Sequence, residues 1–65
     1  MKIEVNGKGV ELAETATLAD LLDQLAIPRK FIAVERNGEL IDEGDFVARL
    51  AEGDRLEIAR FVGGG

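Results

Sequence analysis

The sequence contains no cysteine, histidine, serine, tyrosine or tryptophan, and its only side-chain hydroxyl groups belong to Thr15 and Thr17. Nucleophilic catalysis needs a nucleophile beside a base, and acid–base or metal sites built on histidine need that residue. These classes of active site are therefore excluded or strongly disfavoured. The lack of cysteine also excludes a disulfide framework, which fits the reducing cytoplasm that we expect as the location.

Long apolar runs and clustered positive charge are also absent. No stretch approaches the roughly 20 apolar residues of a transmembrane helix, and the opening MKIEVNG does not resemble a signal peptide, so we expect no membrane association. The chain has 13 acidic and 8 basic residues, a formal net charge of −5. Because phosphate neutralisation requires clustered Lys and Arg, we expect no nucleic-acid partner. The acidity indicates solubility, or docking onto a basic protein partner.

The 65 residues are enough for one domain, in which every element shares one core. The first 12 residues predict a β-hairpin, because apolar and polar residues alternate on both sides of Asn6-Gly7. A helix of roughly ten residues follows, with Leu18, Leu21, Leu22 and Leu25 on one face. Thr17 and Asp20 are spaced as a capping box at its start, and Pro28 ends the run.

The second half of the chain predicts further strands. Residues 31–36 form a strand, Asn37-Gly38 is a second hairpin signal, and residues 39–41 form a short strand. A short helical turn is expected around Phe46, and the last strand begins at Gly53-Asp54. The pattern therefore predicts an α+β fold, in which a mixed four- to five-stranded sheet packs on one main helix. The sheet residues expected to cover the helix are Met1, Ile3, Val5, Val10, Leu12, Ile32, Val34, Leu56 and Ile58.

The chain ends in three consecutive glycines, Gly63, Gly64 and Gly65. Glycine loses more backbone entropy on ordering than other residues and buries no side chain, so we divide the chain into a domain, 1–62, and a flexible tail, 63–65. A tail without Cβ atoms can enter a narrow slot in another protein. Its terminal carboxylate has an ordinary pKa of about 3.3–3.7 and can attack an activated phosphate. The alternative is an inert, frayed end.

These features together resemble the ubiquitin-like sulfur carriers of β-grasp fold, and within them the ThiS family of thiamin thiazole synthesis. The resemblance covers the whole chain. Its most specific parts are the turn and strand of residues 52–58 and the end Phe61-Val62-Gly63-Gly64-Gly65. Met1-Lys2-Ile3, Val5-Asn6-Gly7, the helix of residues 18–25, Ala33-Val34-Glu35 and Asn37-Gly38 also match.

The resemblance implies a sulfur carrier that is a protein co-substrate and not an enzyme. An E1-like adenylyltransferase would use Mg-ATP to adenylate the Gly65 carboxylate, while Gly63 and Gly64 enter that enzyme's active site. Sulfur from a cysteine desulfurase system would convert the adenylate to a thiocarboxylate, and a thiazole synthase would accept the sulfur. The carrier itself would bind no cofactor and no metal.

A docking surface is expected on the sheet face that does not cover the helix. Phe31, Ala59 and Phe61 have the alternation of this face, and Val62 follows directly. Because Phe61 lies at the root of the tail, an apolar patch there would bind a partner; the alternative is ordinary exposed apolar surface.

Four other functions remain open. The chain could be the sulfur carrier of molybdopterin synthesis, although the Val62-Gly63-Gly64-Gly65 end favours the thiamin carrier. It could be a ubiquitin-like protein modifier that forms an isopeptide bond, or an interaction domain with an inert tail. Asp42, Glu43 and Asp45 could in principle form a catalytic or cation-binding group, but such a cluster is typical of solvated surface.

Overall fold

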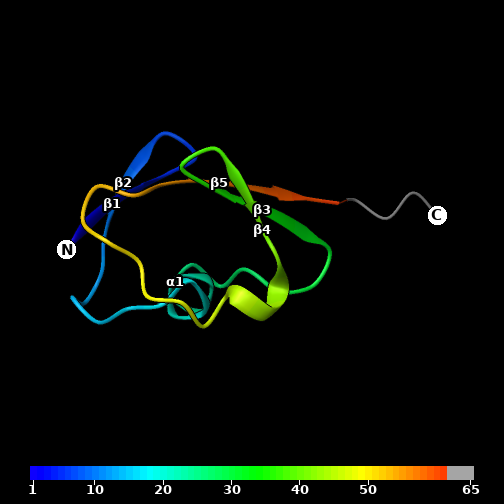
Figure 1. The fold of residues 1–65 in the computed structure, drawn as a ribbon, viewed down its shortest axis with the longest axis horizontal. Helices are drawn as coiled ribbons and strands as arrows, with labels where there is room; N and C mark the ends of the chain where they lie inside the picture. The colour runs from blue at the N-terminus through cyan, green and yellow to red at the C-terminus, as the bar shows by residue number, and fades with distance from the viewer. Residues whose placement is uncertain (62–65) are drawn as a thin grey trace.

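Two asparagine–glycine turns fold the chain into two antiparallel hairpins in the computed structural model, which describes residues 1–61 (Figure 1). The first turn joins β1 (Lys2–Val5) to β2 (Lys8–Glu11), with φ of 49° at Asn6 and 83° at Gly7. The second joins β3 (Ile32–Arg36) to β4 (Glu39–Ile41), and Asn37 and Gly38 again have positive φ. Both predicted hairpins are confirmed. They form at these positions because asparagine and glycine adopt positive φ at low cost.

The last strand, β5 (Arg55–Arg60), lies between the two hairpins and joins them into one sheet of order β2-β1-β5-β3-β4. It pairs parallel with β1 and antiparallel with β3. The sheet is therefore mixed and five-stranded, within the predicted range. Figure 1 shows α1 on one side of this sheet and β5 running through it towards the C-terminal end.

Helix α1 (Leu18–Gln24) begins at the predicted capping box. The Thr17 hydroxyl accepts the Asp20 N–H at 3.1 Å, and the Asp20 carboxylate accepts the Thr17 N–H at 2.9 Å. Two further N–H groups at this end, of Leu18 and Ala19, donate to carbonyl groups of the loop that follows β4. The helix start therefore has partners for the donors that a helix leaves unpaired.

The end of the helix differs from the prediction. The helix has seven residues instead of roughly ten and stops at Gln24, before Pro28. The reason is Ala26, whose φ of 57° turns the backbone out of the helix. Its N–H donates to the Asp23 carbonyl at 3.1 Å and that of Ile27 to the Leu22 carbonyl at 2.8 Å, the Schellman pattern. Leu25 consequently leaves the buried stripe and is 36 % exposed.

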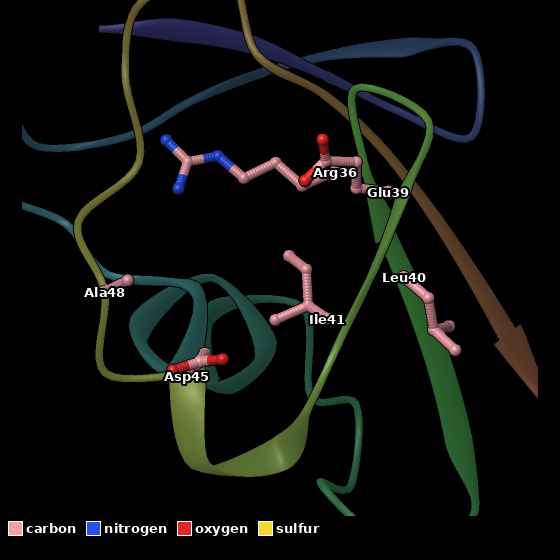
Figure 2. Close-up of a pocket in the computed structure, with 6 residues that line it drawn as sticks. All are labelled: Arg36, Glu39, Leu40, Ile41, Asp45 and Ala48. Atoms are coloured by element: carbon pink, nitrogen blue, oxygen red, sulfur yellow. The ribbon is translucent and has the colours of Figure 1, made fainter.

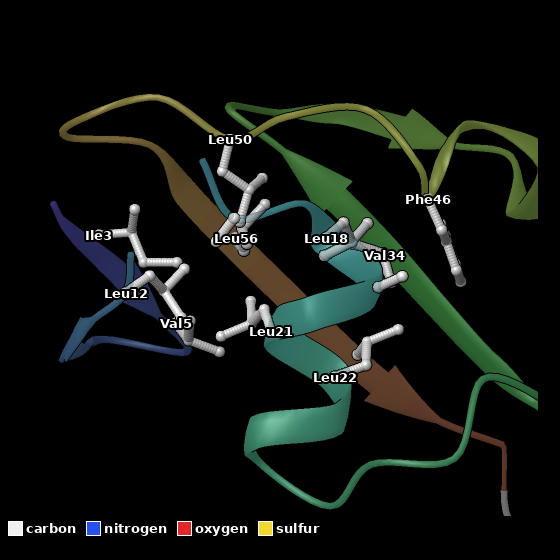
Figure 3. Packing of buried hydrophobic residues seen from close by; sticks show 12 residues of the cluster. Ile3, Val5, Leu12, Leu18, Leu21, Leu22, Val34, Phe46, Leu50 and Leu56 are labelled. Carbon is white, nitrogen blue, oxygen red and sulfur yellow. The ribbon is translucent and has the colours of Figure 1, made fainter. Parts of the chain in front are cut away.

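The core lies between α1 and one face of the sheet (Figure 3). Leu21 and Leu22 are completely buried, and each fully buried leucine contributes about 1.5–3 kcal/mol. All nine sheet residues predicted to cover the helix are buried or packed against this cluster. Within residues 1–61, no helix is long and apolar enough to cross a membrane.

The segment between β4 and β5 closes the end of this core. It contains the predicted helical turn, a 3₁₀ helix η1 (Glu43–Asp45), directly before Phe46. Phe46 and Leu50 are each 5 % exposed and pack with the helix leucines. The Leu50 N–H donates to the Ala16 carbonyl at 3.0 Å, which fixes the segment beside the start of α1.

Candidate functional site

The sheet face away from α1 carries the residues predicted for docking. On β3 and β5 the register places Ala33 opposite Ala59, and Glu35 opposite Glu57. The pairing continues past the strands, since the Phe61 N–H donates to the Phe31 carbonyl at 2.7 Å. The structure therefore brings the predicted residues Phe31, Ala59 and Phe61 together. Val62, Gly63, Gly64 and Gly65 lie outside the described residues.

Leu40 belongs to the same face, and the sequence prediction missed it. It lies opposite Glu35 in the β3–β4 pairing and is 72 % exposed. Figure 2 shows its side chain on the other side of β4 from Ile41, which points towards the helix. Following the hairpin register across Asn37-Gly38 would have found it, because residues directly opposite share a face. We call Phe31, Ala33, Leu40, Ala59 and Phe61 the apolar strip.

Phe31 is the most unusual member of the apolar strip. Its φ is 60°, a conformation that costs about 1–2 kcal/mol for a residue with a Cβ atom. Its side chain is 76 % exposed, so little burial offsets that cost. Strained backbone of this kind concentrates at functional sites, and here Phe31 lines one hollow together with Phe61.

Positive charge borders the aromatic end of the apolar strip. Pro28, Lys30, Phe31, Arg60 and Phe61 line one open hollow. Because Phe61 directly follows β5, this hollow lies where the sheet ends and the C-terminal residues begin. Two aromatic rings and two basic residues therefore lie together at the end of the sheet.

The buried carboxylate of Asp54 lies at the opposite end of β5, and the sequence prediction did not single it out. It accepts hydrogen bonds from the Ala51 N–H at 2.7 Å, the Arg36 guanidinium at 2.9 Å and the Asn37 amide at 3.0 Å. Burial alone would raise the pKa of Asp54, but these bonds and the Arg36 charge outweigh it and lower the pKa. The group is therefore held ionised and fully bonded, which suits a structural role.

Two other groups of polar residues in the described part of the chain offer no reactive arrangement. The hollow beside β4 in Figure 2 is lined by Arg36, Glu39, Leu40, Ile41, Asp45 and Ala48, and its cation is already paired with Asp54 at 2.8 Å. Among residues 1–61 no group of three or more acidic side chains is arranged to hold a metal ion. Asp42, Glu43 and Asp45 do not form such a group either.

Comparison with known proteins adds to this geometry. The profile of the ThiS family matches residues 3–65. The sulfur carrier protein ThiS of Bacillus subtilis (strain 168) is 38 % identical over 65 residues, which cover 97 % of this chain and 98 % of that protein. The crystal structure of the thiamine biosynthesis protein ThiS from Geobacter metallireducens superposes with a TM-score of 0.81, at 35 % identity and with complete coverage of both chains.

A longer relative is a thiazole synthase. That of Paramagnetospirillum magneticum (strain ATCC 700264 / AMB-1) is 35 % identical over 66 residues, which cover 100 % of this chain and 20 % of that protein. The chain thus spans about a fifth of the length of this relative.

Proposed function

This chain belongs to the ThiS family of sulfur carriers in thiamin biosynthesis, and from that premise we propose that the Gly65 carboxylate is the group that carries the sulfur. The observation that supports the proposal is the chemistry of the sequence. It has no cysteine, histidine or serine, so a terminal carboxylate after three glycines is its best available acceptor for a transferable atom.

The proposed reaction begins on an E1-like adenylyltransferase of ThiF type. A carboxylate oxygen of Gly65 attacks the α-phosphorus of Mg-ATP held by that enzyme, and pyrophosphate leaves. A persulfide sulfur supplied by a cysteine desulfurase system then attacks the acyl-adenylate and displaces AMP, which leaves an acyl disulfide. A thiol of that system cleaves the sulfur–sulfur bond, so that the thiol ends as a disulfide and Gly65 ends as a thiocarboxylate. In this scheme ATP and Mg²⁺ belong to the partner, and this chain is a co-substrate.

A thiazole synthase of ThiG type is the proposed acceptor of the sulfur. The likeness between this chain and a fifth of a thiazole synthase supports that partnership. We further propose that the apolar strip, together with Val62, is the surface that docks on partner enzymes. The exposure of Phe31 and Phe61, at 76 % and 61 %, and the position of Phe61 shortly before the glycine tail support this assignment, with Gly63 and Gly64 entering the active site.

Intact-protein mass spectrometry tests the carrier chemistry. The chain is incubated with the adenylyltransferase, Mg-ATP and a sulfur source, and its mass should rise by the difference between one sulfur and one oxygen atom. Deletion of Gly65 should abolish the gain while leaving the thermal midpoint nearly unchanged, because among residues 1–61 the core cluster contains none beyond Ile58.

Three results would contradict the proposal. One is a wild-type chain that binds the enzyme without gaining adenylate or sulfur. Another is a deletion variant that still gains sulfur. A third is a covalent conjugate with another protein, which would identify a modifier instead.

A further inference from the structure

Two glutamates face each other on the sheet face that carries the apolar strip. Glu35 on β3 and Glu57 on β5 are direct partners in the antiparallel register, and both are exposed. Side chains in such positions have Cβ atoms about 4.5–5.5 Å apart, and like charges there destabilise the sheet. We call them the glutamate pair.

Within residues 1–61, no ion pair involves either member of the glutamate pair. The ion pairs of this part of the chain join Met1 to Glu14, Arg29 to Asp23 and Arg36 to Asp54. The nearest basic residue on the same face of β5 is Arg55, which is opposite Glu4 in the β1–β5 register. Arg36 and Arg60, the neighbours in sequence, have the opposite alternation, because they pair with Leu56 and Ile32.

The neighbours of the glutamate pair belong to the apolar strip. Leu40 lies opposite Glu35, and Ala33 and Ala59 are one step along the same face. Phe31, with its unfavourable φ of 60°, ends that row. One face therefore combines two features that each cost stability and that the fold itself does not explain. Natural proteins accept such costs where a binding function needs them.

We propose that the glutamate pair binds a lysine or arginine side chain of the adenylyltransferase on which the apolar strip docks. The proposal rests on the carrier function proposed above. A guanidinium group has five donors in a planar fork and can bridge two carboxylates at this separation. Once Leu40 and the alanines are covered, the charge-assisted hydrogen bonds are shielded from water and gain strength. The net charge of −5 favours the approach of a basic surface.

The test replaces the charge of the pair with neutral isosteres and uses the adenylyltransferase as the binding partner. Glu57→Gln and Glu35→Gln should each weaken binding roughly tenfold in low salt, and the wild-type affinity should fall as salt rises. Glu39→Gln is the matched control, because it changes the net charge equally and lies on the neighbouring strand with the opposite alternation. That variant should bind nearly as the wild type does.

Thermal unfolding supplies a second readout. Removing one charge of the pair should leave the midpoint unchanged or raise it, so weaker binding cannot be attributed to poorer folding. The inference is overturned if Glu57→Gln and Glu39→Gln bind equally well. It is also overturned if sedimentation shows that the glutamates govern self-association of the chain. Neither result concerns sulfur transfer by the wild-type chain, so the carrier function stands or fails on its own test.

Discussion

Replacing Asp54 with asparagine removes the charge at the start of β5 while keeping the size of the side chain. In the wild-type protein one carboxylate oxygen accepts hydrogen bonds from the Ala51 N–H at 2.7 Å and from the Arg36 guanidinium at 2.9 Å. The other oxygen accepts a hydrogen bond from the Asn37 amide at 3.0 Å. Asparagine has a single side-chain oxygen, which can replace only one of these two acceptors. Its amide group then faces the Asn37 amide, which cannot rotate without losing the Arg55 N–H that its own oxygen accepts at 2.9 Å.

The expected cost follows from these contacts. Hydrogen bonds to charged groups contribute about 1.5–3 kcal/mol. The variant loses one of them and the ion pair with Arg36, whose side chain is only 28 % exposed. We expect a loss of about 2–3 kcal/mol from a free energy of unfolding of about 3–10 kcal/mol for a chain of this length. Chemical denaturation should show this loss, and the thermal midpoint should fall by about 10–20 °C.

The loss of stability caused by Asp54→Asn should also become smaller as the pH falls. The pKa of Asp54 is lower in the folded protein than its ordinary value, so its contribution is complete above the unfolded pKa of about 3.9. It is lost as the pH falls through the folded pKa. The stability difference between wild type and Asp54→Asn should therefore narrow as the pH is lowered from about 5 to about 2.

Asp45→Asn is the control for this series, because Asp45 is exposed and should change stability by less than about 0.5 kcal/mol. If Asp54→Asn changes the free energy of unfolding at neutral pH as little as Asp45→Asn does, the reasoning about the buried carboxylate is refuted. A difference that stays constant at low pH would refute the linkage argument in particular.

Two further substitutions test other features. Ala26→Gly should stabilise the protein by about 0.5–1 kcal/mol in chemical denaturation, because glycine adopts the φ of 57° without the Cβ penalty; a loss of stability would contradict the Schellman interpretation. Phe61→Ser should weaken binding to the adenylyltransferase at least about tenfold with little change in thermal midpoint, since Phe61 is 61 % exposed; wild-type affinity would rule out docking through the apolar strip.

Local patterns predicted most of the fold. The two asparagine–glycine turns, the capping box and the alternating apolar residues each depend on neighbours a few positions away, and all are present in the structure. The helix end was wrong because the prediction relied on Pro28. An alanine with positive φ has no sequence signature; in the structure it accompanies the Schellman bonds and the packing of Ile27 against the core.

The candidate site was predicted only in part. Ala59 and Phe61 follow the predicted alternation, and Phe31 lies beside Phe61 although its positive φ breaks that alternation. Leu40 and the opposition of Glu35 to Glu57 depend on strand register. Register between β3 and β5 joins residues 20 or more positions apart, which no local pattern determines. The Asp54 network likewise joins Arg36 and Asn37 to a turn far along the chain.

The central position of β5 has a mechanical consequence for any enzyme that grips the chain end. A load applied through Gly65 would reach the domain along a strand bonded to β1 on one side and β3 on the other. Its hydrogen bonds would resist such a pull together, in shear, whereas an edge strand can be peeled away one bond at a time. Under the proposed function, the domain would thus act as a rigid handle for the partner enzymes that bind its terminus.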